Sequence, residues 1–275
     1  MKERLANLHV HTRYSDGSFT PEEAVRHAKE KGLAAIAITD HDSINGLEEA
    51  LRTGEEIGIE VIPGVEISAE RENKEIHMLG YYIDYKDSTL LEFLRGIRED
   101  RKKRVYKMVE ALNQHGLSIN AGDVLEYAGD VSISRLHIAQ YMEAKGLVSS
   151  WREAFKKYIG DTKPCYVSSF TYTPKEVIEA IKNAGGIAVI AHPGFDGLDK
   201  IIPQLVEDGI EGIEAFHTEH NAETSRRYEE YAKEHNLLIT GGSDCHGTLK
   251  GKVLMGTTTV TYSYVEALKR HVQYS

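Results

Sequence analysis

Two patterns of apolar residues alternate along the first third of the chain: short continuous runs and helical spacings. One continuous run is "AAIAIT", which has the length expected of a strand buried on both faces of a sheet. In "PEEAVRHAKEKG" the apolar residues instead recur every three or four positions, with Thr20 as the N-cap, Pro21 at the helix start and Gly32 at its end. This alternation predicts strand–helix units that build a parallel sheet with right-handed crossovers.

The same pattern sets the expected elements of the whole chain. Strands are expected over residues 6–12, 34–39, 59–70, 75–84, 187–192, 212–217, 237–244 and 252–260. Helices between them are expected over about residues 21–31, 44–57, 174–186, 222–236 and 264–272. Asp42 precedes the second helix and is expected to cap it.

The rhythm of the chain changes at about Ser88. A long charged amphipathic pattern begins there, followed by helical patterns in "ISRLHIAQYMEAKG" and "WREAFKKYI", and no strand-like run appears for some seventy residues. We therefore expect a mostly helical insertion over residues 88–165. The remaining segments, residues 1–87 and 166–275, are expected to form one α/β catalytic barrel.

Composition narrows the function classes. The chain has 275 residues and a net charge of -10, which argues against binding to duplex nucleic acid, since that requires a basic face. Cys165 and Cys245 are the only cysteines, too few for a disulfide framework or a cysteine zinc site. No apolar run reaches the roughly 18 residues that span a membrane, and no secretory signal is evident, so a cytoplasmic protein is expected. The sequence does not predict the oligomeric state.

The thirteen histidines are the unusual feature of the composition, and many of them lie at strand ends beside carboxylates. Parallel strands end on one face of a barrel, so these side chains are expected to converge there. Strand alternation places His9 and His11 on one side with Val10 on the other, and it makes Cys245 a packed core residue. Imidazole and carboxylate together are ligands for zinc, manganese or iron. The strand-end residues are His9, His11, Asp40, His41, Glu66, His77, His192, His217, Asp244 and His246.

Six segments resemble, in order, the motifs of the PHP (polymerase and histidinol phosphatase) superfamily: "LHVHTRYSDG", "TDHDSINGL", "PGVEIS", "EIHMLGY", "IAHPG" and "GGSDCHG". The similarity is closest to the stand-alone phosphoesterases, including the nucleoside bisphosphate phosphatase and 5′–3′ exonuclease branch. The resemblance implies an α/β fold, a distorted (β/α)₇ barrel, and two or three divalent metal ions (Mn, Fe or Zn).

The resemblance also implies how the metals are held. A first metal would be bound by His9, His11, Glu66 and Asp244. Glu66 would bridge to a second metal, held also by His77 and His192. A third would be bound by Asp16, His41 and His246. Asp40 is expected to orient a ligand histidine by a hydrogen bond and so to support catalysis.

Substrate contacts are expected from two further segments. "ISRLHIAQ" carries Arg135 and His137 on the insertion, which would act as a substrate cap, and it resembles a Ser/Gly-Arg-x-His segment of related phosphoesterases. The resemblance implies that Arg135 binds a phosphate. "FHTEH" carries His217 and His220, which would face the phosphate, and His220 would take part in catalysis. The alternatives are a surface ion pair for Arg135 and purely structural roles for the two histidines.

These residues predict a metal-dependent phosphoesterase that acts on phosphate monoesters or diesters of nucleotides or short oligonucleotides. Metals in such sites generate hydroxide near neutral pH and clamp phosphate oxygens, so no covalent serine or cysteine intermediate is expected. Histidinol-phosphate phosphatase is the alternative activity. A non-catalytic metal-binding regulatory protein is the alternative of another class, and the complete ligand set argues against it.

Overall fold

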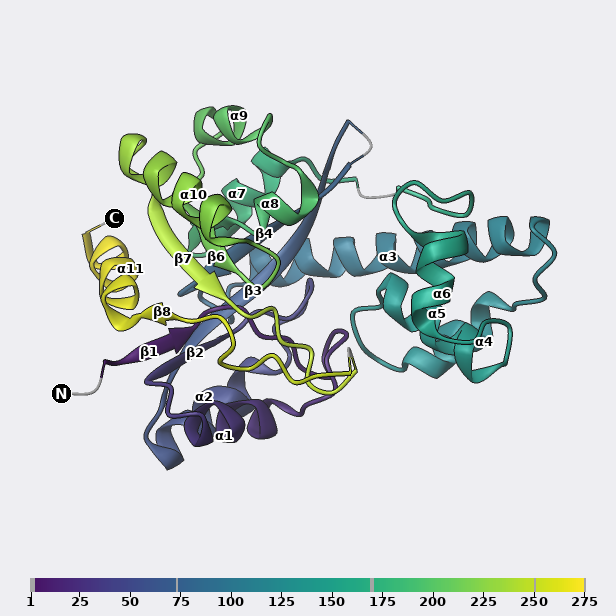
Figure 1. The fold of residues 1–275 in the computed structure, drawn as a ribbon, viewed down its shortest axis with the longest axis horizontal. Helices are drawn as coiled ribbons and strands as arrows, with labels where there is room; N and C mark the ends of the chain where they lie inside the picture. Colours follow the sequence, from purple (N-terminus) through teal and green to yellow (C-terminus); the bar gives the residue numbers. More distant parts are fainter. Residues whose placement is uncertain (1–2, 73, 169–170, 250, 275) are drawn as a thin grey trace.

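The computed structural model describes residues 3–72, 74–168, 171–249 and 251–274, in which one sheet is wrapped by helices (Figure 1). Within these residues the sheet has eight strands in the order β7-β6-β5-β4-β3-β2-β1-β8. The strands are β1 Leu5–Asn7, β2 Ala35–Ile38, β3 Glu60–Arg71, β4 Lys74–Tyr81, β5 Ile187–Ile190, β6 Gly212–His217, β7 Leu238–Gly242 and β8 Val260–Thr261.

The sheet nearly closes on itself between the segments that follow β1 and β7. The Leu8 N–H donates to the Gly241 carbonyl over 3.1 Å, and Val10 pairs with Cys245 in a parallel bridge. The ends of the first and seventh strands thereby lie next to each other. The predicted α/β fold with a distorted barrel is confirmed.

The barrel is less parallel than expected. β4 runs antiparallel to both β3 and β5, and β8 runs antiparallel to β1. The short turn between β3 and β4 permits only a hairpin, because a parallel crossover needs about a dozen residues or more. The strand predicted over residues 252–260 is wrong: only Val260–Thr261 pairs with β1, and Gly256 takes a positive φ of 77° inside the preceding turns.

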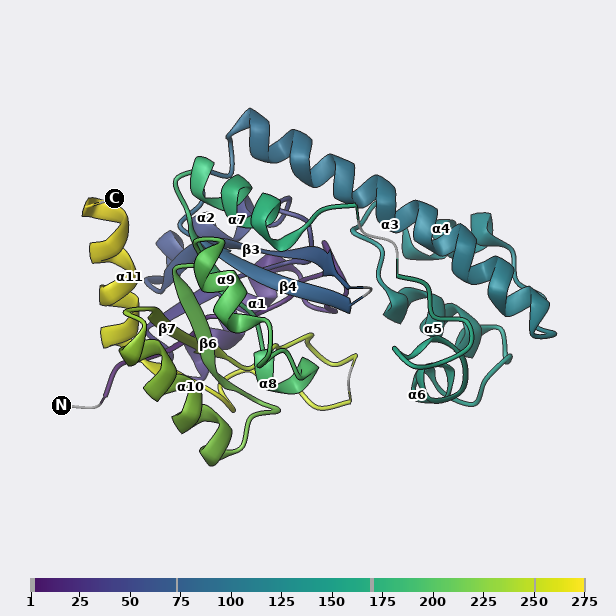
Figure 2. The same cartoon turned by 90° about the horizontal axis from the view of Figure 1, so that it is seen from above.

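Helices cover the outside of the barrel (Figures 1 and 2). Thr20 and Thr173 are the N-caps of α1 and α7, and their capping boxes fix where these helices begin. α2 begins at Leu47 with Gly46 as its N-cap, so the predicted capping role of Asp42 is wrong. The outer helices are α1 Pro21–Glu30, α2 Leu47–Ile57, α7 Pro174–Asn183, α8 Pro193–Asp196, α9 Ile202–Glu207, α10 Ala222–Glu234 and α11 Tyr262–Tyr274.

A second group of helices extends to one side of the barrel (Figure 2), carried by the long helix α3. It has its own apolar cluster, which includes Met108, Leu112 and Met142. One member, α4, was not predicted from the sequence. We call these elements the helical unit: α3 Ser88–Gln114, α4 Ala121–Ala128, α5 Arg135–Ala144, α6 Trp151–Ala154 and the π-helix η1 Phe155–Ile159. Its assignment as a separate insertion over residues 88–165 stays a prediction.

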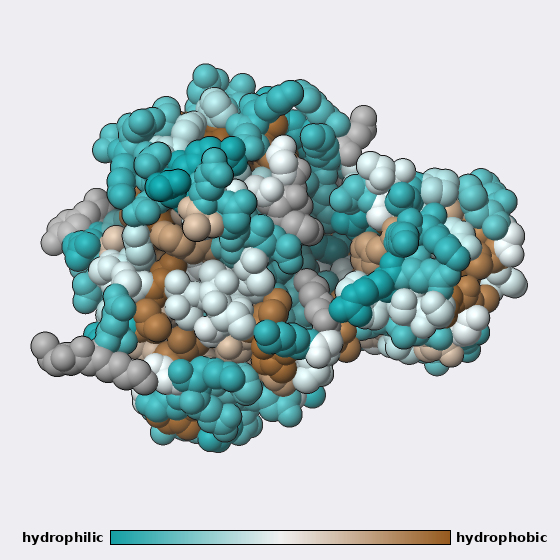
Figure 3. Space-filling view, in the orientation of Figure 1, coloured by the Kyte–Doolittle hydropathy of each residue, from teal (hydrophilic) through white to brown (hydrophobic). Residues whose placement is uncertain are grey.

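A recess separates the barrel from the helical unit (Figure 3). It contains a cavity of about 410 Å³, lined by barrel residues such as Glu66 and His77 and by residues of the helical unit such as Arg135 and Trp151. Among the described residues, no helix is both long enough and apolar enough to cross a bilayer.

Candidate metal centre

Nine imidazole and carboxylate side chains converge at the barrel end of this cavity. They come from different elements, as the strand-end pattern predicts. These are the segment that follows β1 (residues 8–16, the β1 extension), the ends of β2 and β5, the middle of the β3–β4 hairpin, and the segment after β7. They form four overlapping groups whose potential ligand atoms lie within 4.8 Å of one another in each group. The groups are His11, Asp16, His41 and His246; His9, His11 and Asp244; His9, Glu66 and His192; and His41, Glu66 and His77.

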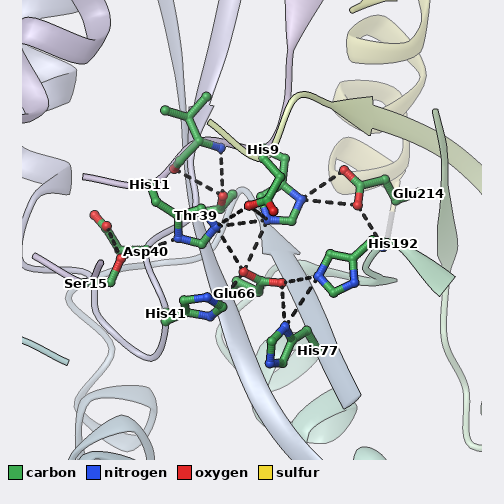
Figure 4. Close-up of polar contacts among 12 residues, drawn as sticks. His9, His11, Ser15, Thr39, Asp40, His41, Glu66, His77, His192 and Glu214 are labelled. Atoms are coloured by element: carbon green, nitrogen blue, oxygen red, sulfur yellow. Dashed lines mark hydrogen bonds and ion pairs between the residues drawn. The ribbon is translucent and has the colours of Figure 1, made fainter. Parts of the chain in front are cut away.

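Glu66 lies at the middle of these groups (Figure 4). Its Oε1 is 2.8 Å from His192 Nε2 and 3.1 Å from His77 Nδ1. Its Oε2 is 3.2 Å from His9 Nε2 and 3.1 Å from His11 Nε2. One carboxylate oxygen therefore faces each pair of imidazoles, the arrangement required of a bridging ligand.

The far nitrogens of several imidazoles are held by other groups, which leaves the near nitrogens pointing into the cluster. His9 Nδ1 lies 3.0 Å from Glu214, His77 Nε2 lies 3.1 Å from Glu75, and His246 Nδ1 lies 2.9 Å from the Asp244 carbonyl. Metal-ligating histidines are typically fixed in this way. Two near atoms, Asp16 Oδ1 and His41 Nδ1, are buried without a well-directed hydrogen bond within the described structure, although each lies 3.2 Å from another member of the cluster, His246 Nε2 and Glu66 Oε2 respectively. The donor set therefore fits divalent cations.

Electrostatics also favour a cation in the cluster. Burial alone would lower the pKa of His9, but Glu214 and Glu66 raise it to about 10. Burial opposes protonation of His77 as well, yet Glu66 and Glu75 raise its pKa to about 9. The carboxylates thus outweigh desolvation, and the site stabilises positive charge, whether carried by protons or by metal ions.

Glu214 is a functional residue that the sequence analysis missed. It is fully buried on β6, accepts from His9 Nδ1 at 3.0 Å and accepts the His192 backbone N–H at 2.8 Å. One carboxylate thereby fixes the ring of one ligand and the backbone of another. A signal was present, since "GIEAFH" places a single glutamate inside an apolar strand run.

We expect Glu214→Gln to weaken metal binding by roughly ten- to a hundredfold, since loss of a group that orients a ligand histidine has effects of that size. The measurement is competition for metal against a chelating dye. Glu211→Gln is the matched control, because Glu211 directly precedes the same strand but contacts His271 outside the centre. Equal metal affinity in the two variants would contradict the role given to Glu214.

Three arginines of the helical unit face the centre. Arg104 Nη2 lies 2.9 Å and Arg135 Nη2 3.6 Å from Glu75 Oε2. These arginines hold the pKa of the Glu75 carboxyl well below its usual range, against the effect of burial. Arg101 also lines the cavity and pairs with Asp42. The sequence analysis named Arg135 but missed the two on α3, whose spacing of three residues places them on one helix face.

Asp40 is buried beside the centre, but its partners differ from those predicted. Its carboxylate accepts from Thr12 N at 2.7 Å, Thr12 Oγ1 at 2.6 Å and Ser15 Oγ at 2.6 Å rather than from a ligand histidine. Ser15 Oγ is in turn 3.4 Å from His11 Nδ1. Asp40 therefore shapes the loop that carries Asp16 and is linked to the ligand His11 through Ser15, while its role in catalysis stays a prediction.

Two predicted substrate histidines form hydrogen bonds with the backbone. His220 donates from Nδ1 to the Ala215 carbonyl at 3.0 Å and accepts the Gly194 N–H at Nε2 over 3.1 Å. Both ring nitrogens thus contact the backbone, and the catalytic role of His220 stays a prediction. His137 accepts the Ser134 N–H at 3.0 Å as part of a capping box on α5, and it is absent from the residues that line the cavity. It therefore acts as a helix cap here, and its contact with substrate stays a prediction.

His217 remains close to the centre. Its Nδ1 accepts the Glu219 N–H over 3.2 Å, and its Nε2 lies 3.8 Å from Asp244 Oδ2. Accepting at Nδ1 places the proton of the neutral ring on Nε2, the atom that faces Asp244. The structure thus keeps His217 beside a predicted ligand.

The comparisons with known proteins agree with this geometry. Residues 7–160 match the model of the PHP domain family. The chain is 34% identical over 258 residues to a 3′,5′-nucleoside bisphosphate phosphatase of Chromobacterium violaceum, covering 92% of this chain and 90% of that protein. It is also 34% identical over 245 residues to a 5′-3′ exoribonuclease of Haemophilus influenzae, covering 87% and 89%. A solved structure described as a metal-dependent phosphoesterase, from Bifidobacterium adolescentis, superposes with a TM-score of 0.86 at 33% identity, covering 96% of this chain and 94% of that one.

A barrel whose strand ends gather nine such side chains beside an arginine-lined cavity defines a hydrolase of the metal-dependent phosphoesterase class. The chain belongs to the PHP domain family. Membership in this class also excludes the alternative of a non-catalytic metal-binding regulator.

Proposed function

We propose that this protein hydrolyses phosphate esters of nucleotides or short oligonucleotides with two or three divalent metal ions (Mn, Fe or Zn). The relatives named as a nucleoside bisphosphate phosphatase and an exoribonuclease support the substrate class. The observation that carries the proposal is the single cavity that joins Glu66 and its histidines to Arg104 and Arg135. A small phosphorylated substrate fits this cavity. Duplex nucleic acid would instead be repelled by the net negative charge of the protein. A cytoplasmic location stays a prediction.

Nine residues would hold the metals: His9, His11, Asp16, His41, Glu66, His77, His192, Asp244 and His246. When bound, such metals polarise phosphate oxygens and activate water. Glu214 and Glu75 would keep His9 and His77 aimed at the cluster, and His217 would support Asp244. Arg104 and Arg135 would bind a second phosphate of the substrate through their guanidinium groups. In the absence of substrate, Glu75 holds these guanidinium groups in place.

A substrate panel on metal-reconstituted protein tests the proposal. It contains a nucleoside 3′,5′-bisphosphate, a short 5′-phosphorylated oligonucleotide, histidinol phosphate and an aryl phosphate. We expect the first two to have the highest kcat/KM. A preference for histidinol phosphate would overturn the nucleotide assignment in favour of the alternative activity, and inactivity on all four would overturn the phosphoesterase proposal itself.

Arg135→Ala is expected to raise KM for the nucleoside bisphosphate far more than for the aryl phosphate, because the aryl ester has no second phosphate for the guanidinium. Loss of one charge-assisted contact lowers kcat/KM roughly ten- to a hundredfold. Arg95→Ala is the control, since Arg95 pairs with Glu92 on the exposed side of α3 and does not line the cavity within the described residues. An equal effect on both substrates would show that Arg135 does not select between them.

A further inference from the structure

An apolar wall, mostly aromatic, belongs to the part of the cavity that the helical unit lines. It is formed by Trp151 of α6, Phe155 of η1 and Leu136 of α5, all of which line the same space as His77 and His192. Trp151 and Phe155 are only partly buried, although both also pack against the apolar cluster of the helical unit. Their indole and phenyl rings stand nearly perpendicular, at 87°, with centroids 6.1 Å apart.

The local backbone is built to present this wall. Residues 155–159 form a π-helix, a rare element that occurs frequently at functional sites. It ends at Gly160, whose N–H donates to the Phe155 carbonyl over 3.0 Å. A Cβ at position 160 would lie 2.6 Å from that carbonyl oxygen, so only glycine allows this close turn. The turn brings Asp161 to the cavity, where it pairs with Arg135.

The chemistry of the wall differs from that of the rest of the cavity. The barrel lines the cavity with carboxylates and imidazoles, whereas the helical unit contributes the arginines and, in Trp151, Phe155 and Leu136, the apolar side chains of the lining. Aromatic side chains left partly exposed beside cationic groups are suited to stacking on nucleobases, whose flat faces bind without regard to sequence. The volume of about 410 Å³ lies within the about 300–1,000 Å³ typical of small-molecule sites. It suits a single nucleotide unit.

We propose that Trp151 and Phe155 bind the base of one nucleotide by stacking, with Leu136 in apolar contact beside them, while a phosphate of that nucleotide lies at the metal centre. The inference rests on the proposed function and deepens it. The space between the metal centre and the wall would then accommodate one terminal nucleotide. Esters that lack a planar ring at this distance are poorer substrates, whatever the identity of the base.

The chain provides its own probe, because Trp151 is its only tryptophan. Adenosine 5′-phosphate and ribose 5-phosphate, which differ only in the base, are each mixed with the full-length, metal-loaded protein in a stopped-flow instrument. Tryptophan emission is recorded before turnover. We expect saturable quenching with adenosine 5′-phosphate and none with ribose 5-phosphate. Equal responses to the two ligands, or no response to either, would overturn the proposal.

Variants at Phe155 give a second measurement. Phe155→Leu keeps an apolar side chain but removes the ring, and we expect it to raise the Kd for adenosine 5′-phosphate roughly five- to a hundredfold, the range found for loss of one stacking ring. Phe155→Tyr retains the ring and is expected to bind nearly as the parent chain does. Tyr106→Ala is the matched control, since Tyr106 is an aromatic of the helical unit that is 56% exposed and lies outside this cavity.

These results separate the two proposals. If nucleotides are hydrolysed but Phe155→Leu binds as tightly as Phe155→Tyr, the stacking wall is wrong and the proposed function stands. If base-dependent quenching is present but no nucleotide is hydrolysed, the wall stands as a binding site and the catalytic proposal fails.

Discussion

Glu66→Gln is expected to remove nearly all turnover and to lower the metal content of the purified protein. Glu66 is fully buried and places one oxygen against His77 and His192 and the other against His9, His11 and His41. An amide keeps the volume but replaces one of these oxygens by a donor and removes the charge. The loss should exceed the about 100-fold upper effect of a residue that only orients a ligand, such as Glu214.

Two readings check the Glu66 prediction. Metal content is measured by elemental analysis after gel filtration, and turnover with an aryl phosphate at saturating metal. Glu60→Gln is the matched control, because Glu60 lies on the same strand but pairs with Lys269 away from the metal centre. Near-normal turnover and metal content in Glu66→Gln would remove the bridging role and with it the shared centre.

The sequence predicted those side chains of the metal centre whose positions follow from strand alternation and from the ends of the strands. His9 and His11 share one side of the β1 extension while Val10 packs in the core, as alternation requires. Cys245 is likewise buried in the apolar core between two predicted ligands. The grouping of the ligands around separate metals came instead from the family resemblance, because spacing alone does not show which strand ends are neighbours.

Side chains outside the strands were not predictable in the same way. His220 lies three residues beyond the end of β6, where a turn directs its ring to the backbone of Gly194 and Ala215. The predicted strand over residues 252–260 has suitable β-branched residues, but only Val260–Thr261 finds a partner strand. Tertiary contacts determine both the orientation of the His220 ring and the extent of the last strand, and the local sequence does not predict these contacts.

The buried pair Asp42–Arg101 shows the same limit most clearly. The sequence analysis predicted a long charged amphipathic helix here, and that pattern does not show which of its charged residues are buried. In the structure Arg101 is only 3% exposed and Asp42 is fully buried. Helical periodicity identifies the face of a helix, but whether an arginine on that face meets solvent or a carboxylate depends on the element packed against it.

This pair carries the largest stability effect that we expect. Arg101 donates to the Asp42 carboxylate, to Ser68 Oγ at 2.7 Å and to the Ile133 carbonyl at 3.1 Å, which joins the barrel to the helical unit. Arg101→Ala would leave the Asp42 carboxylate buried without its cation. Breaking a buried pair from one side typically lowers the free energy of unfolding by about 3–5 kcal/mol.

Urea unfolding at a fixed metal concentration measures the loss. Lys102→Ala is the control from the next position of α3, and it should change stability by less than about 0.5 kcal/mol because the Lys102–Glu99 pair is half-exposed. The double variant Arg101→Met with Asp42→Ala should be less destabilised than the sum of the two single changes, since neither charge is then left alone. Strict additivity, or a loss in Arg101→Ala no larger than in Lys102→Ala, would mean that the two units are held together by their apolar contacts and not by this ion pair.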